Sequence, residues 1–236
     1  MRWFPLFADL RGRPALVVGG GEVGERKVAL LLEAGACVTV VSLAFTDCLR
    51  AQAGAVVLVE GEFDESLLDG QRLVVAATGD KTVNARVAAA AEARNIFCNS
   101  VDDPERSSFI VPAIVDRSPV VVAISTCGVA PVLARHLRER IETVLDSAIG
   151  PVAKMLEAWR GRIRSAYPEV GLRRRFYEWV LQGPVMAQLR SARLAEAERT
   201  LALAVAGGTG GAGARHWCKS APVPGTGARG SVALVG

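Results

Sequence analysis

Three glycines near the amino end of the chain have the spacing of a phosphate-binding turn. Gly19, Gly21 and Gly24 follow a short apolar run and precede a stretch with helical character. In a G-x-G-x-x-G turn the first glycine permits a tight bend, the second lets a pyrophosphate approach the backbone, and the third lets the helix pack closely on the strand. Free N–H groups at the start of the helix then bind phosphate. The chemistry that these residues predict is dinucleotide binding.

The surroundings of the glycines strengthen this interpretation. A second apolar run, residues 37–41, follows the helix and completes a strand–helix–strand unit of the expected size. A purely structural turn is the alternative, because glycine-rich turns join strands to helices in many proteins that bind nothing. The second strand leads into Ser42, Leu43 and Ala44, without the usual acidic residue for the ribose. No basic residue replaces it, so we expect NAD rather than NADP.

Two further predicted strands end in polar residues. The run 73–77 ends at Ala77 and Thr78, and the strand 96–99 leads to Asp102. Ligands bind at the carboxyl ends of the strands in open α/β sheets, so these ends should lie near the glycine turn. Asp102 is a candidate general base. A turn-forming role is the alternative, because Asp-Asp-Pro is a natural turn sequence.

The remaining elements are predicted from hydrophobic periodicity. Residues 1–12 form an apolar lead-in that should pack on the sheet, and 55–59 should be a third strand. Residues 108–115 and 120–124 flank a polar turn and predict an antiparallel hairpin, in which Pro112 indicates an edge strand or a bulge. Such a hairpin is marginal alone and needs more strands, and we expect a second copy of the chain to supply them. Helices are expected near 65–68 and over 82–93, 131–145, 151–166, 171–181 and 184–205.

Composition and charge limit the classes of function. The chain has 236 residues, 50% of them hydrophobic, and a net charge of +4. Residues 1–130 carry 12 basic and 16 acidic side chains, whereas residues 131–193 carry 12 and 6. The basic excess of the second part suggests an anionic partner, and solvated helix faces are the alternative.

Cysteine usage and apolar runs bear on location. The five cysteines form no C-x-x-C pair and their number is odd, which favours a reduced, cytoplasmic compartment. No apolar run is long enough to span a bilayer, and charged residues interrupt the amino-terminal run before a signal peptide could form. We expect no membrane and no nucleic-acid partner.

Four stretches together resemble a known family. VGGGEVGERK at 18–27, AAT at 76–78, NSVD at 99–102 and PVLAR at 131–135 are similar to the amino-terminal half of siroheme synthase, the precorrin-2 dehydrogenase and sirohydrochlorin ferrochelatase module. The resemblance covers nearly all of residues 1–205. Residues 232–236 also resemble the opening strand of the methyltransferase domain that follows in the fused enzyme.

The resemblance implies a bifunctional enzyme of siroheme and porphyrin biosynthesis, both an oxidoreductase and a lyase. NAD takes hydride from precorrin-2 to give sirohydrochlorin, and ferrous iron enters as substrate in the same cavity of a homodimer. Asp102 would be the general base of both steps. No metal ligands are expected from the protein, because the macrocycle supplies its nitrogens, and His136 is more simply a surface or packed residue. The cofactor-binding residues would be Gly19, Gly21, Glu22, Val23, Gly24, Ser42, Leu43, Ala44, Ala77, Thr78, Asn99 and Val101.

The predicted substrate loop departs from the family pattern. Ser125, Thr126 and Gly128 match it, but Cys127 replaces a glycine, and Val129 and Ala130 replace hydroxyl residues. Thr126 stands where the family carries a regulatory phosphoserine, which makes such control doubtful here. The tetrapyrrole is a polycarboxylate, so arginines of the second part are candidates as a group: Arg160, Arg162, Arg164, Arg173, Arg174 and Arg175. The alternative function is an NAD-sensing dimer without catalysis.

The predicted fold is an α/β Rossmann-like parallel sheet followed by a small β-hairpin dimerisation region and a C-terminal helical domain. The expected divisions are an NAD-binding domain at 1–107, a dimerisation hairpin and helix at 108–147, and a helical domain at 148–206. Residues 207–236 are rich in glycine and small residues, as in a flexible linker, followed by the start of a methyltransferase domain. We expect them to be dispensable for both activities.

Overall fold

The computed structural model describes residues 2–208 of the chain. The predicted linker and methyltransferase-like strand fall within residues 209–236, outside the described residues. Two compact units are present among these residues, one made of 2–113 with Ser125–Ala134, and the other of Ile114–Ile124 with 135–208. The region predicted as 108–147 is therefore divided between the two units.

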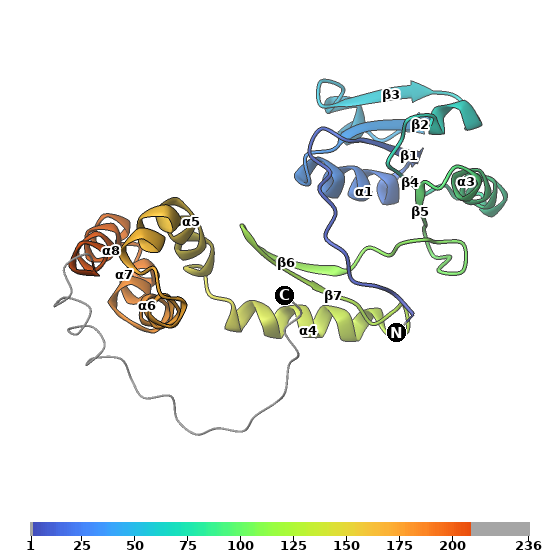
Figure 1. The fold of residues 1–236 in the computed structure, drawn as a ribbon. Helices are drawn as coiled ribbons and strands as arrows, with labels where there is room; N and C mark the ends of the chain where they lie inside the picture. The colour runs from blue at the N-terminus through green and yellow to red at the C-terminus, as the bar shows by residue number, and fades with distance from the viewer. Residues whose placement is uncertain (1, 209–236) are drawn as a thin grey trace. The chain divides into compact units, whose positions relative to one another are not determined.

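A five-stranded parallel sheet forms the centre of the first unit, with strand order β3-β2-β1-β4-β5 (Figure 1). Every hydrogen-bonded pair of neighbouring strands in it is parallel. This order confirms the predicted Rossmann-like sheet. The strands are β1 (Pro14–Gly20), β2 (Cys37–Phe45), β3 (Val56–Glu60), β4 (Leu73–Ala76) and β5 (Phe97–Ser100).

Helices cover both faces of this sheet. On one face Val17 of β1 packs with Val28 of α1, and on the other face Leu16 and Val18 pack with Val87 of α3. Burial on both faces explains the continuous apolar sequence of β1. The helical elements of the unit are α1 (Glu22–Glu33), α2 (Asp47–Ala51), the 3-10 helix η1 (Glu65–Leu68) and α3 (Lys81–Ala93).

Most of the predicted elements of this unit are confirmed, with two differences. β2 continues to Phe45, four residues beyond the predicted end, and its last residue pairs with Gly20 across an irregular register. The short helix α2 was not predicted, because five residues are too few for a clear period. Thr46 caps it by accepting a hydrogen bond from Leu49 N–H at 3.3 Å.

The prediction that residues 1–12 pack on the sheet is wrong for most of that segment. Phe4, Leu6 and Phe7 are 81%, 64% and 70% exposed. Of the lead-in, Leu10 packs against the α1-side core. The reason is that α1 and α3 already cover the two faces of the sheet.

In the second unit a two-stranded hairpin, β6 (Ala113–Arg117) and β7 (Val120–Ile124), precedes α4 (Pro131–Val144). The strand predicted from residue 108 begins only at Ala113. Ser108 N–H instead donates to the carbonyl of Cys98 at 2.8 Å, and Phe109 packs against the α1-side core, so this segment belongs to the large sheet unit. Pro112 therefore precedes β6 and does not interrupt the hydrogen bonds between β6 and β7.

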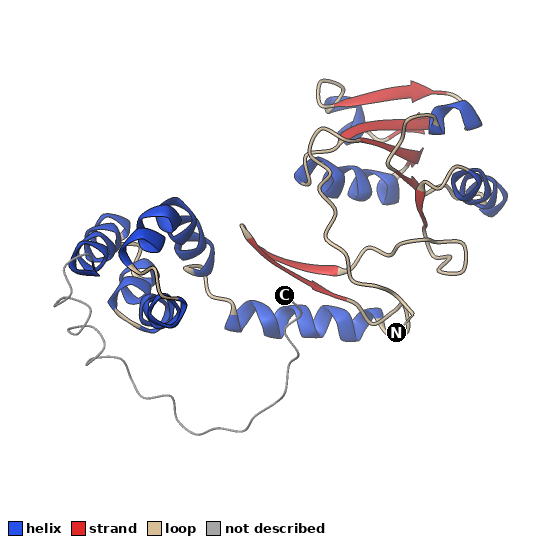
Figure 2. Cartoon of the chain, in the orientation of Figure 1, coloured by secondary structure: helices blue, strands red, loops and turns tan. Residues whose placement is uncertain are grey.

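Four helices complete the second unit (Figure 2): α5 (Ile149–Ala166), α6 (Val170–Gln182), α7 (Pro184–Arg190) and α8 (Leu194–Gly208). Their core includes Phe176, whose ring stacks on Tyr167 with centroids 4.7 Å apart. The single helix predicted over 184–205 is wrong, because the backbone turns at Ala192 with φ of 56°. At the other end Gly150 packs against the Arg117 and Ser118 carbonyls of the hairpin turn, where a Cβ would lie 2.8 Å from the Arg117 oxygen.

None of the helices within residues 2–208 is both long and apolar enough to cross a membrane.

Candidate cofactor and substrate site

The glycine turn has the backbone features that nucleotide binding requires. Gly19 has φ of +117°, and a Cβ there would lie 2.5 Å from the carbonyl oxygen of Ala77. A Cβ at Gly24 would collide with the carbonyl oxygen of Gly19. These two positions therefore need glycine for folding alone, whether or not a ligand binds.

Gly21 is different because no fold contact requires it to be glycine. It is the N-cap of α1, no side chain caps that helix end, and no atom lies within 4 Å of an added Cβ. The N–H groups of Glu22, Val23 and Gly24 thus begin the helix without a side-chain partner. Such an open, uncapped helix start fits a phosphate group.

The turn lies at the topological switch point of the sheet. β1 and β4 are neighbours, yet the chain leaves β1 toward β2 and leaves β4 toward β5, in opposite directions. The two following helices therefore diverge onto opposite faces and leave a crevice at the carboxyl edge, where ligands bind in this class of sheet. Ala77 follows β4 there, and its N–H donates to the Val18 carbonyl at 2.8 Å.

Acidic residues in the first turn of α1 face this predicted anion site. Glu22 is exposed, and Glu25 accepts a hydrogen bond from the Thr46 hydroxyl at 2.6 Å. That bond, with a second from the Cys48 thiol, holds the pKa of Glu25 below its usual value. Thr46 N–H in turn donates to the Gly20 carbonyl at 3.0 Å, so these bonds join the first turn of α1 to the residue after β2 beside the glycine turn.

The end of β2 provides the predicted adenosine side. Ser42, Leu43 and Ala44 lie in this strand, and Leu43 is 70% exposed. Ser42 pairs in register with Glu60, the exposed last residue of β3. Glu60 of β3 thus lies beside the end of β2, which has no acidic residue of its own. Sequence reasoning missed it because the pairing of β2 with β3 sets this proximity.

Asn99 and Val101 occupy the end of β5 as predicted. Asn99 is buried, and its Nδ2 donates to the carbonyl of Phe109 at 3.1 Å. Val101 N–H donates to the Ala76 carbonyl at 2.9 Å, which attaches this loop to the end of β4. The structure thus brings the ends of β1, β4 and β5 to one edge.

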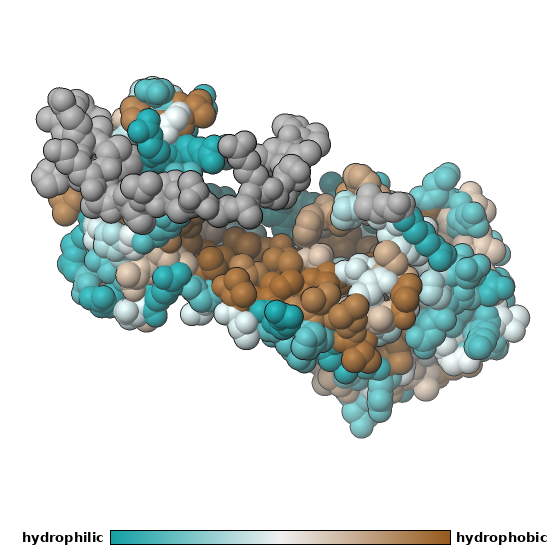
Figure 3. All heavy atoms as spheres, turned by 90° about the horizontal axis from the view of Figure 1, so that it is seen from below, coloured by the Kyte–Doolittle hydropathy of each residue, from teal (hydrophilic) through white to brown (hydrophobic). Residues whose placement is uncertain are grey.

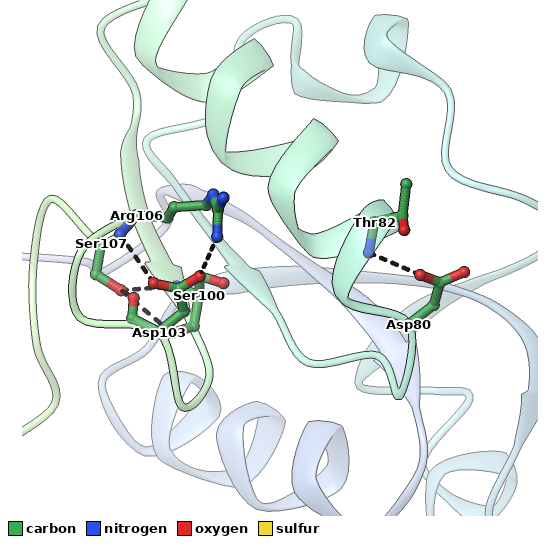
Figure 4. A network of polar contacts seen from close by, with 6 residues as sticks. All are labelled: Asp80, Thr82, Ser100, Asp103, Arg106 and Ser107. Carbon is green, nitrogen blue, oxygen red and sulfur yellow. Dashed lines mark hydrogen bonds and ion pairs between the residues drawn. The ribbon is translucent and has the colours of Figure 1, made fainter.

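Asp102 and Asp103 have different surroundings. Asp103 pairs with Arg106 at 2.7 Å (Figure 4), and this hydrogen bond lowers the pKa of the Asp103 carboxyl. The Ser107 hydroxyl donates to the backbone of the same turn, at Asp103 and Ser100. Asp102 is exposed and has φ of 59°. Left-handed backbone at a non-glycine residue is uncommon and occurs often at functional sites.

Lys27 is a further residue at this edge that sequence reasoning missed. It lies on α1 one residue before the buried Val28 and is itself half-buried. Burial is the main cause that lowers the pKa of Lys27; Arg26 adds to the effect, and the charge of Asp102 opposes it. Lys27 is thus a cation close to the candidate base. The sequence contained one signal for Lys27, because a lysine lies there among the core-facing positions of the predicted helix.

The predicted substrate loop joins the sheet unit near the Asp102 turn. A Cβ at Gly128 would lie 3.7 Å from Pro104. Ser125 accepts from Cys127 N–H at 3.0 Å, and the Thr126 hydroxyl donates to the Ala130 carbonyl at 3.0 Å. Cys127 has φ of 57°, a left-handed conformation that glycine adopts without strain. The cysteine that replaces the family's glycine at this position therefore strains the backbone.

Within residues 2–208 no three His, Cys, Asp or Glu side chains converge to hold a metal ion, and His136 is exposed. The second unit has an open groove of about 620 Å³ between α5 and α8, lined by Trp159, Arg162, Ser165 and small apolar residues. None of the predicted catalytic or cofactor-binding residues lines it.

Comparisons with known proteins agree with this geometry. The family described as "Putative NAD(P)-binding" matches residues 6–113, and "Sirohaem synthase dimerisation region" matches residues 148–205. Siroheme synthase of Escherichia coli (strain SMS-3-5 / SECEC) is 52% identical over 190 residues, which are 80% of this chain and 42% of that protein. The chain is a homologue of part of siroheme synthase. The enzyme of strain 55989 / EAEC matches to the same extent.

The siroheme synthase relationship confirms the resemblance predicted from the four sequence stretches. The chain spans only 42% of the length of these relatives. The solved structure of SirC, precorrin-2 dehydrogenase, has a TM-score of 0.66 and 22% identity, covering 85% of this chain and all of that one. This likeness shows that the fold is shared.

Proposed function

We propose that this chain catalyses the NAD-dependent oxidation of precorrin-2 to sirohydrochlorin, followed by insertion of ferrous iron to give siroheme. The observation that carries the proposal is the 52% identity to siroheme synthases. The position of an exposed carboxylate, Asp102, after β5 at the edge that holds the glycine turn supports it.

The residues present fit NAD. The uncapped start of α1 and the open position at Gly21 would hold the pyrophosphate, and the exposed end of β2 would hold the adenosine. Glu60 beside Ser42 would repel a 2′-phosphate, which favours NAD over NADP. When bound, NAD accepts the hydride that leaves the macrocycle. A comparison of the KM values for NAD and NADP tests this preference.

Asp102 is the proposed general base. Oxidation removes one hydride and one proton from the macrocycle, and iron insertion releases two pyrrolic N–H protons. An exposed carboxylate that is held in place by its backbone can accept these protons one at a time and return them to water. Asp103 is unsuited to this role because Arg106 already binds its carboxylate.

Basic side chains of α5 and α6 are the proposed partners of the substrate carboxylates. Arg174 pairs with Glu178, and Arg173 donates to the Tyr167 and Pro168 carbonyls. Arg162 lies over the Trp159 ring, 4.8 Å from its centroid. Arg160, Arg164 and Arg175 are exposed and form no ion pair among the described residues. We therefore expect these three arginines, rather than the others of the group, to bind the substrate carboxylates.

The proposed assembly is a homodimer in the cytoplasm. A family named for dimerisation matches residues 148–205. Exposed apolar side chains are also present on the hairpin and α4, and Figure 3 shows hydrophobic residues, in brown, exposed on the face that it draws. Ile114, Val121, Val132, Leu133 and Val144 are the exposed apolar residues of the hairpin and α4.

Anaerobic incubation with precorrin-2 and NAD tests the function directly. We expect the absorption spectrum of sirohydrochlorin to appear first, and that of siroheme after addition of ferrous iron. NAD binding without either spectral change would favour the alternative, an NAD-sensing dimer without catalysis.

A further inference from the structure

Asn84 is a buried polar residue that none of the roles above uses. It lies in the first turn of α3 and is 7% exposed. Three hydrogen bonds join its side chain to one residue, Thr78. Its Oδ1 accepts from the Thr78 N–H at 3.2 Å and from the Thr78 hydroxyl at 2.7 Å, and its Nδ2 donates to the Thr78 carbonyl at 3.0 Å. One amide therefore binds both backbone groups of Thr78 and its hydroxyl.

The segment that Asn84 holds lies against the glycine turn. The carbonyl oxygen of Ala77 is 2.5 Å from the position of a Cβ on Gly19, closer than any side chain permits. The Ala76 carbonyl accepts from Val101 N–H at 2.9 Å, on the strand end that leads to Asp102. Residues 76–78 thus contact both the predicted pyrophosphate turn and the predicted catalytic loop.

The helix that carries Asn84 has its own cap. Asp80 Oδ1 accepts from Thr82 N–H at 2.7 Å and from Val83 N–H at 3.4 Å, which satisfies the start of α3 without Asn84. Val87 and other buried residues on the same helix pack it on the sheet. The Asn84 amide is therefore not needed to start or to pack α3, and its hydrogen bonds serve the loop.

We propose that Asn84 is a positioning residue that holds residues 77–79 as one wall of the cofactor site. The inference rests on the proposed function, because it assigns NAD to that site. Without the amide, the backbone groups of Thr78 lose their partners, and the exposed Gly79 lets the loop take other conformations. The cofactor then has to order the loop when it binds, which weakens its affinity.

The two activities separate this role from a merely structural one. Oxidation of precorrin-2 uses NAD, whereas iron insertion into sirohydrochlorin consumes none. A residue that acts through the nucleotide loop should alter the first activity and spare the second. A residue that only stabilises the fold should alter both in the same proportion.

The experiment compares Asn84→Ala with Val87→Ala in the full chain. Calorimetry gives the NAD dissociation constant, and assays give KM and kcat for NAD and the rate of iron insertion. We expect Asn84→Ala to weaken NAD binding about tenfold, as for the loss of a buried hydrogen-bond partner, with iron insertion changed less than about twofold. Val87→Ala, which removes a buried side chain of the same helix, should lower the thermal midpoint and leave NAD affinity unchanged.

One further variant protects the test. Asn84→Asp keeps the two bonds that Oδ1 accepts from Thr78 and replaces the donor to the Thr78 carbonyl with an oxygen, so it should also weaken NAD binding while iron insertion is spared. If Asn84→Ala fails to fold, Asn84→Asp decides the question in the same way. Unchanged NAD affinity in Asn84→Ala, or equal losses in both activities, overturns the inference while the proposed function stands. A parent chain that binds no NAD overturns both.

Discussion

Asp102 and Asp103 are adjacent in sequence, but of the two only Asp103 forms an ion pair among the described residues, with Arg106 at 2.7 Å. We predict that Asp102→Ala folds and binds NAD but loses on the order of a hundredfold or more in both activities, as for the loss of a positioned base. Asp103→Ala should retain most of both rates, because its carboxylate only tightens the turn. Assays of the two variants side by side check this, and the opposite ranking would identify Asp103 as the base.

Gly21 provides a second prediction at the residue scale. Asp is a favoured N-cap residue, so Gly21→Asp should leave the stability of α1 unchanged or raise it by about 0.3 kcal/mol. The same carboxylate should abolish NAD binding, because it occupies the phosphate position and repels its charge. Thermal unfolding and calorimetry measure the two effects. Retained NAD affinity would show that the glycine turn is only structural.

At the scale of elements, Asp146 connects the start of α5 to α7. It accepts from Ala148 N–H at 2.9 Å and pairs with Arg190 at 2.8 Å, and the Arg190 hydrogen bond is the main cause that lowers the pKa of Asp146. A lowered folded pKa stabilises the native state above the unfolded value of about 3.9, and this contribution is lost as the pH falls through the folded value.

Asp146→Asn should therefore reduce the free energy of unfolding at pH 7, by about 0.5 to 1 kcal/mol for a partly exposed pair. The difference from the parent chain should persist down to about pH 4 and shrink only below it, as the pH falls toward the lowered pKa of the folded state. Urea unfolding at several pH values, followed by tryptophan fluorescence, measures it. Glu196→Gln, which breaks the exposed pair with Arg193, is the control and should change stability less.

At the scale of the whole molecule, α4 has one buried residue, Ala134, whereas Val132, Leu133 and Val144 are 76%, 48% and 79% exposed. A helix with so much uncovered apolar surface predicts a partner, and we expect a homodimer held by residues 108–145. Sedimentation equilibrium at micromolar concentration should give the dimer mass. Leu133→Asp should shift it toward the monomer, whereas Val57→Asp, at an exposed position of β3, should not. A monomeric parent chain would contradict the prediction.

Local patterns in the sequence determined the elements and the list of site residues. Gly19 and Gly24 could be recognised because their spacing reflects backbone contacts within one strand–helix unit, and β1 because burial on both faces requires a continuous apolar run. The sequence predictions failed where packing between distant parts of the chain determined the structure. Phe4, Leu6 and Phe7 are apolar but exposed, because helices already cover the sheet. The helix predicted over 184–205 breaks at Ala192, where the chain turns so that α8 packs on α7.

Proximity between distant residues was decided by the tertiary structure alone. The strand order placed Glu60 beside Ser42, and the fold brought Lys27 within electrostatic reach of Asp102. Over shorter separations, the turns after β4 and β5 decided which groups meet: Asn84 bonds to Thr78, and Arg106 pairs with Asp103 rather than with Asp102. The physical reason is that periodicity reports which face of an element is buried, whereas hydrogen bonds and charges depend on which elements become neighbours.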